Sequence, residues 1–136
     1  LGDNSYSMNS ANAGDFRIRA IGPYYTKDFV MTENSKKYSN YLIIGSLVGL
    51  DTKLANKMGQ NKMRSAYSTP AEVYFNGQII GKLQINGDGM RIKIPNSLIR
   101  PNTTNQITIK TGYNLSRNDR IDYDDIEILN LSILTE

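Results

Sequence analysis

Hydrophobic and polar positions alternate through much of the second half of this chain, most clearly over residues 71–83, AEVYFNGQIIGKL. The apolar or small positions are Ala71, Val73 and Phe75 before an Asn-Gly pair and Ile79, Gly81 and Leu83 after it. A two-residue hairpin turn needs positive φ at both central residues, which Asn tolerates and Gly adopts freely. The stretch therefore predicts two strands joined by a tight turn, with alternate side chains on opposite faces.

Further strands are expected at residues 16–20, 27–33, 41–50, 90–94, 105–110 and 124–134. The last of these shifts its apolar parity between Ile128 and Leu129, which indicates a bulge or burial on both faces. Between residues 51 and 66, Asp51 as an N-cap and Gly59 at a C-terminal position predict one or two helical turns inside a long loop. Residues 112–123 read as a polar loop.

The spacing of these elements predicts an all-β fold. Seven or eight short strands, about ten residues apart with turn signals between them, are typical of an antiparallel β-sandwich or jelly roll, here with a short helical turn in one loop. The first fifteen residues, rich in Asn, Ser, Gly and Asp, predict a flexible arm or linker at 1–15, and residues 16–136 one sandwich domain. The start at Leu1-Gly2 rather than Met suggests a processed or excised piece.

Composition removes several kinds of chemistry. The chain of 136 residues has no His, no Cys and no Trp, so disulfides, thiolate or imidazole metal sites and Ser-His-Asp or Cys-His catalysis are excluded. The net charge of +3 is a mild bias toward anionic partners and too small to indicate nucleic acid. The longest apolar run, residues 41–50, is too short to span a membrane.

The order of signals in the second half resembles the galactose-binding-like jelly roll. The stretches are AEVYFNGQIIG, then IKIPNSLIRPNTTNQITI, then YDDIEILNLSIL, within residues 71–134. This resemblance implies the fold of many carbohydrate-binding modules and of accessory β-sandwich domains of glycoside hydrolases and polysaccharide lyases. The chain departs from the pattern at residues 101–105, PNTTN, where these domains usually have a shorter turn, and in having no Trp to stack on sugars.

Sugar recognition needs flat faces that cover the C–H side of a pyranose and polar groups that bind its hydroxyls. The loop after residue 112 offers Tyr113, Asn114, Arg117, Asn118 and Asp119, and Tyr24, Tyr25 and Tyr67 lie on other expected loops that can converge on it. The candidate ligand-binding residues are therefore Tyr113, Asn114, Arg117, Asp119, Tyr67 and Tyr25, unless these side chains belong to ordinary solvated loops that pack back on the core.

Outward strand positions are basic. They are Arg17, Arg19, Lys82, Arg91, Lys93 and Lys110. If several share one sheet they form a surface suited to uronate carboxylates, and if they are divided between sheets they form an ordinary solvated face. The basic loop at 51–66 has two readings as well: contact with an anionic ligand or neighbouring domain, or a helical plug at one end of the sandwich.

Many jelly-roll binding modules hold a structural Ca²⁺ near the first and last strands. The resemblance thus implies a calcium site made by Asp124, Asp15 and Asn12, since Ca²⁺ takes six to eight oxygen ligands. The alternative is that Asp122 and Asp124 pair with Arg117 or Arg120. No pair of acids is marked for glycoside hydrolysis, so no catalytic residue is expected.

The sequence leads to a working hypothesis. The chain is a non-catalytic carbohydrate-binding module for a polysaccharide that includes acidic sugars, and it forms one module of a larger extracellular or cell-surface protein, with no nucleic-acid partner and no membrane insertion. The alternative is a structural or adhesion sandwich that binds protein or positions a neighbouring domain. A third possibility is the receptor-binding tip of a phage or virus, which would use the same fold and predicts a trimer.

Overall fold

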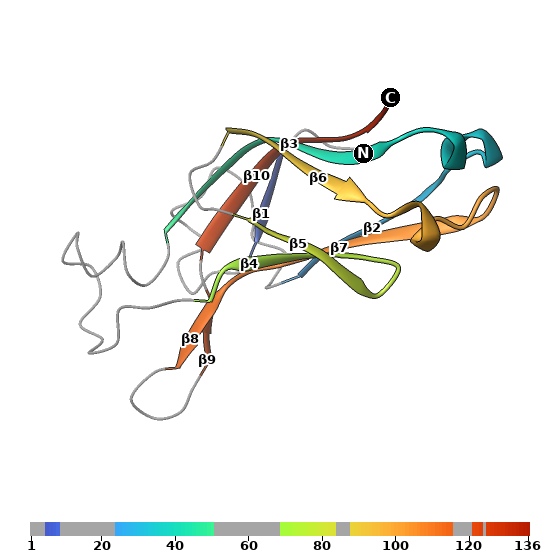
Figure 1. The fold of residues 1–136 in the computed structure, drawn as a ribbon. Helices are drawn as coiled ribbons and strands as arrows, with labels where there is room; N and C mark the ends of the chain where they lie inside the picture. The colour runs from blue at the N-terminus through green and yellow to red at the C-terminus, as the bar shows by residue number, and fades with distance from the viewer. Residues whose placement is uncertain (1–4, 9–23, 51–68, 84–87, 116–120, 124) are drawn as a thin grey trace.

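Two four-stranded antiparallel sheets face each other in this chain (Figure 1). The computed structural model describes residues 5–8, 24–50, 69–83, 88–115, 121–123 and 125–136. The first sheet has, in spatial order, β1 (Ser5–Met8), β10 (Asp125–Thr135), β3 (Asn40–Leu50) and β6 (Asp88–Ile94). The second has β2 (Tyr24–Val30), β7 (Thr104–Lys110), β4 (Ala71–Phe75) and β5 (Gln78–Leu83), and β8 (Tyr113–Leu115) pairs with β9 (Ile121–Tyr123).

The chain passes repeatedly from one sheet to the other, as in a jelly roll. The predicted all-β sandwich is therefore confirmed. Within the described residues the helical elements are two 3-10 turns, η2 (Glu33–Lys37) and η3 (Asn96–Leu98), and the helical turn expected at 51–66 lies outside that part of the chain. None of the helical segments in the described residues has the length and apolar character to cross a membrane.

The core fills the space between the sheets with aliphatic side chains. Alternation along β4, β6 and β7 sends every second residue inward, which confirms the predicted pattern in these strands. Phe75 lies fully buried and meets Phe29 edge to face, with ring centroids 6.1 Å apart. The fully buried aliphatic residues around it are Leu42, Ile44, Val73, Ile94, Ile107, Ile109 and Ile128.

The β4–β5 hairpin forms as expected, with φ of 48° at Asn76 and 82° at Gly77. Its pairing contains a bulge, however: Val73 lies opposite Gly81 and Tyr74 opposite Ile79, so one strand has an extra residue. The extra residue reverses the parity, and Ile79 is 50% exposed. The prediction that Ile79 continues the inward alternation of the hairpin was wrong for this reason.

Parity also changes in β10, as predicted. Ile128 and Leu131 are both buried although they are three residues apart, and Asn130 between them has φ of 57°. Pairing of β10 with β3 keeps one register on both sides of this point, so Asn130 lies opposite Gly45 and turns the strand without a bulge.

Two segments contain strands where the sequence suggested none. Ser5–Met8, within the expected arm, forms β1 and pairs with β10. The expected polar loop contains β8 and β9 at its two ends, because Tyr113 pairs with Tyr123 and Leu115 with Ile121. Figure 1 shows this small hairpin projecting from the end of the second sheet.

A buried amide, Asn105, ties the β4–β5 turn to the start of β7. Its Oδ1 accepts hydrogen bonds from the Arg100 N–H (2.8 Å) and from Asn76 Nδ2 (2.9 Å), and its Nδ2 donates to the Arg100 carbonyl (2.8 Å). Asn76 Nδ2 donates in addition to the Leu98 carbonyl (2.8 Å), and Asn76 Oδ1 accepts from the Gln106 N–H (2.8 Å). Because Asn105 is fully buried, these bonds replace the water that its amide gives up.

Candidate functional site

The outer face of the second sheet gathers aromatic, charged and hydroxyl side chains. Register places four residues directly opposite one another across all four strands, and we call them the outer row: Tyr24, Lys110, Glu72 and Lys82. Their neighbours in sequence Tyr25, Ile109, Val73 and Leu83 point into the core, so the outer row faces away from it. A second row, two residues along, consists of Thr26, Thr108, Tyr74 and Ile79.

Lys110 joins two tyrosine rings from different elements. Its Nζ lies 5.9 Å from the ring centroid of Tyr24 on β2 and 5.2 Å from that of Tyr113 on β8. Both distances are within the range of cation–π attraction, which holds an ammonium beside an aromatic face. Tyr24 is 50% exposed, so it offers solvent an apolar surface next to a positive charge.

Glu72 and Tyr74 form a polar pair on β4, two residues apart and thus on the same face. Tyr74 Oη donates a hydrogen bond to Glu72 Oε1 at 3.2 Å. The pKa of Tyr74 is raised above its ordinary 10.0, first by partial burial of the phenol and then by the charge and hydrogen bond of Glu72; Lys110 acts in the opposite direction. The phenol therefore stays a hydrogen-bond donor beyond the pH at which an exposed tyrosine ionises.

Ionisation of Tyr74 is expected to weaken the fold only at alkaline pH. Because its folded-state pKa is raised, its contribution to stability is complete below the unfolded value of 10.0 and is lost as pH rises through the folded-state pKa. The difference in tyrosinate absorbance between the wild-type protein and Tyr74→Phe isolates this phenol. We expect a midpoint above 10.0, moved downward by Glu72→Gln. A wild-type midpoint at or below 10.0 would contradict the raised pKa, and an unchanged midpoint in Glu72→Gln would contradict the contact with Glu72.

The structure brings together only some of the tyrosines expected to converge. Tyr113 and Tyr24 meet at Lys110, as anticipated for rings from different elements. Tyr24 and Tyr25 were expected in a loop, and this was wrong: β2 begins three residues before the expected strand at 27. Strand alternation then sends Tyr25 into the core, where it is 3% exposed, away from the face that Tyr24 occupies.

Of the other candidate residues, the structure describes only Asn114. Asn114 belongs to β8 and lies opposite Asp122 on β9. Arg117, Asp119 and Tyr67 lie outside the described residues, as do the expected calcium ligands Asp124, Asp15 and Asn12. Among the described residues, no group of three or more acidic side chains is placed to hold a metal ion.

Sequence reasoning missed Glu72, Tyr74, Thr26 and Thr108 as members of a site. The signal for the first two was present, since alternation at 71–75 already puts them on the face opposite Val73. What alternation does not show is which strands are neighbours. Pairing of β7 between β2 and β4 brings Lys110 between Tyr24 and Glu72, residues far apart in sequence.

The basic residues of the strands divide between the two sheets. Lys82 and Lys110 belong to the outer row, whereas Arg91 and Lys93 lie on β6 of the first sheet. Arg91 is already engaged, with its guanidinium 4.4 Å from the Tyr41 ring centroid and 3.0 Å from Glu136 Oε1. Arg17 and Arg19 lie outside the described residues. The described residues therefore do not form one broad basic face.

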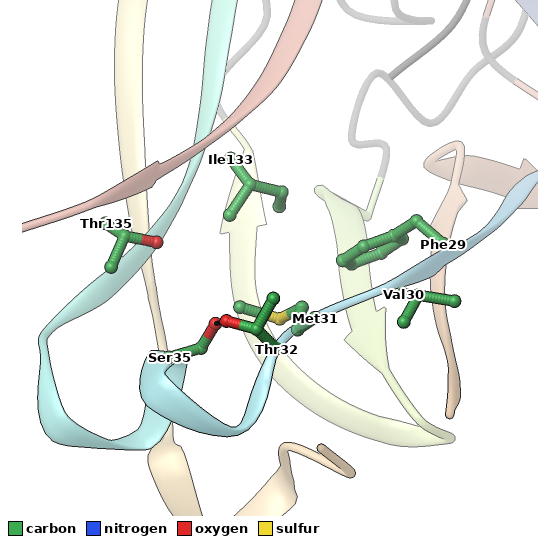
Figure 2. Close-up of a pocket in the computed structure, with 7 residues that line it drawn as sticks. All are labelled: Phe29, Val30, Met31, Thr32, Ser35, Ile133 and Thr135. Atoms are coloured by element: carbon green, nitrogen blue, oxygen red, sulfur yellow. Dashed lines mark hydrogen bonds between the residues drawn. The ribbon is translucent and has the colours of Figure 1, made fainter. Parts of the chain in front are cut away.

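A pocket of about 340 Å³ opens at the edge of the sandwich, between the ends of β2 and β10 (Figure 2). Phe29, Met31 and Ile133 give it apolar walls. Its hydroxyls bond to the protein itself: Thr32 Oγ1 lies 3.4 Å from Ser35 Oγ, and Thr135 Oγ1 donates to Asn40 Oδ1 at 2.8 Å. The pocket suits an apolar group better than a sugar, which needs directed polar partners.

The chain is thus an all-β sandwich whose second sheet has aromatic and charged side chains on its outer face. No family model matches this chain, and no curated protein matches it. Among solved structures, apo β-glucuronidase from Ruminococcus gnavus is similar, with a TM-score of 0.46, 14% identity and coverage of 78% of this chain and 19% of that chain. The complex of that enzyme with D-glucuronic acid has a TM-score of 0.46 and 14% identity, and the match covers 78% of this chain and 20% of that chain. This chain spans about a fifth of the length of these glucuronidase chains.

Proposed function

We propose that this chain is a non-catalytic carbohydrate-binding module of the galactose-binding-like class, carried by a larger secreted or cell-surface protein. The observation that supports it is the Lys110 ammonium beside the rings of Tyr24 and Tyr113 on an accessible sheet face. Tyrosine rings cover the C–H side of a sugar, and an ammonium binds its hydroxyls or a carboxylate. The hydroxyls of Thr26 and Thr108, 3.3 Å apart in the next row, extend the polar surface.

Glu72 and Asp28, the acids that the described strands place on this face, support binding rather than hydrolysis. Hydrolysis needs two carboxyl groups about 5 to 9.5 Å apart across the scissile bond. Glu72 and Asp28 are separated by two strands and by four residues along β7, which amounts to about 17 Å from strand spacing and rise. Both are also engaged, Glu72 by Tyr74 and Asp28 by Gln106 Nε2 at 3.0 Å. The proposal therefore assigns no catalytic role to them.

Affinity electrophoresis on a panel of neutral and acidic polysaccharides tests this function. We expect retardation by at least one polymer and about a tenfold weaker affinity for Tyr24→Ala, which corresponds to about 1.4 kcal/mol. Tyr38→Ala is the matched control, because Tyr38 is 52% exposed and lies outside the outer row and its neighbouring rows. Equal loss in both variants would contradict a site on this face, and no retardation of the wild-type protein would contradict the carbohydrate proposal.

Runs with calcium and with a chelator belong to the same experiment. The proposed structural Ca²⁺ site of Asp124, Asp15 and Asn12 predicts weaker retardation or a lower unfolding temperature after chelation, since an ion that binds only the folded state stabilises it.

A second candidate function is a structural or adhesion domain that contacts protein. The observation that favours it is the apolar pocket, whose rim includes Val30 at 66% exposure. Large apolar side chains exposed beside a hollow are typical of contact sites between proteins.

A further inference from the structure

The sheet sets the backbone spacing between the two lysines of the outer row. Lys110 is on β7 and Lys82 on β5, with β4 between them. Two strand spacings amount to about 10 Å. Within the described residues the structure has one ion pair, Arg91 with Glu136, so neither lysine is neutralised by a direct ion pair in that part of the chain.

Glu72 stands at the midpoint of these two charges. The outer row thus presents positive, negative and positive groups in order, one strand apart, with the aromatic ring of Tyr24 at one end. Glu72 keeps its orientation through the hydrogen bond from Tyr74. A carboxylate of a ligand is attracted at the two outer positions and repelled at the central one, while a sugar hydroxyl donates to Glu72.

This spacing matches a chemical repeat. Two strand steps equal the length of one disaccharide in an extended linear glycan, so a chain lying across the strands places every second sugar at a lysine. Building on the proposed function, we infer that the ligand is a linear glycan with a uronate at every second sugar, whose carboxylates bind Lys82 and Lys110 and whose intervening neutral sugar lies over Glu72.

The repulsive centre gives the inferred site its selectivity. A polymer with a carboxylate on every sugar sets a negative charge near Glu72, and like charges at short range oppose binding. A neutral polymer leaves both lysines without a carboxylate. The alternating polymer is the one that satisfies all three positions.

The test compares three probes on the full chain. They are hyaluronan, in which glucuronate alternates with an N-acetylated sugar, its carboxyl-reduced neutral form, and polygalacturonate. Affinity electrophoresis and calorimetry are run on the wild-type protein, on Lys82→Gln, Lys110→Gln and Glu72→Gln, and on Lys93→Gln as the control. Lys93 is an exposed lysine on the other sheet, so its substitution makes the same change of charge outside the site. Circular dichroism checks that each variant is folded.

We expect hyaluronan to bind most tightly, with each of Lys82→Gln and Lys110→Gln weakening it about fivefold, the scale of an accessible ion pair. Added salt should reduce this difference. Glu72→Gln should strengthen binding of polygalacturonate and change hyaluronan little, and Lys93→Gln should change neither.

Two results would overturn the inference while the proposed function stands. One is tighter or equal binding of the neutral or fully charged polymer; the other is hyaluronan binding that Tyr24→Ala weakens and neither lysine variant does. If no polymer of the wider panel binds the wild-type protein, the proposed function fails and the inference fails with it.

Discussion

Replacing Asn105 with alanine is expected to lower the free energy of unfolding by about 3 kcal/mol, because the substitution leaves several buried polar groups without partners. Asn105 is fully buried, and its amide bonds to the N–H and carbonyl of Arg100 and to the side chain of Asn76. Each bond is between 2.8 and 2.9 Å long. Alanine retains the backbone of β7 and removes these three bonds together with the 3.2 Å bond from Asn105 Nδ2 to the Thr103 carbonyl. The β4–β5 turn then stays connected to this region only through the bonds of Asn76 to Leu98 and Gln106.

Urea unfolding followed by circular dichroism measures this loss, with Asn34→Ala as the control. Asn34 is an exposed asparagine in η2, and surface substitutions of this kind usually change stability by less than about 0.5 kcal/mol. A loss below about 1 kcal/mol for Asn105→Ala would mean that water or a rearranged turn satisfies the groups around it.

The other large effect is expected for Phe75→Ala, at about 3 to 5 kcal/mol. Phe75 ends β4 fully buried between the sheets and packs edge to face on Phe29. Its removal leaves a cavity in a region where the neighbouring side chains come from both sheets and cannot collapse together easily. Domains of this size have about 5 to 15 kcal/mol of stability in total, so the variant is expected to approach the limit of folding.

Ile79→Ala on the adjoining strand is the matched control for this cavity. Ile79 is half exposed and lies opposite Tyr74 on the outer face, so its truncation should cost well under half as much. Similar losses in the two variants would show that the β4–β5 hairpin, rather than the core, limits stability. The dependence of unfolding on urea should keep the same slope if the folded and unfolded states keep their compactness.

Local patterns predicted the individual strands well and their relationships poorly. Alternation at 71–75 and 90–94, together with the Asn-Gly turn, was sufficient for the hairpin and for β6. The bulge that exposes Ile79 depends on how β5 pairs with β4, and nothing in the sequence of either strand alone specifies it. The same applies to β8 and β9, which are three residues each and become strands because they pair with each other.

In the candidate site too, the sequence indicated single residues but not which of them meet. Tyr113 and Lys110 were recognised from residue type and from position in the chain. Their meeting with Tyr24 requires β2 and β7 to be neighbours, which is a property of the sheet order. Tyr25 was misplaced because β2 begins three residues earlier than expected, so Tyr25 is a strand residue whose side chain points into the core, not a loop residue.

The hydrogen bonds around Asn76 also affect how readily this protein is deamidated. An asparagine followed by glycine is chemically fragile in a flexible peptide, because the glycine nitrogen attacks the side-chain carbonyl carbon, ammonia leaves, and the resulting succinimide opens to aspartate or isoaspartate. In the folded chain the Asn76 amide is held by Leu98, Asn105 and Gln106, so it is not free to rotate onto the nitrogen of Gly77. Folding therefore protects the turn from deamidation, whereas each unfolding event exposes it to this reaction, and the isoaspartate product would insert a methylene into the hairpin backbone.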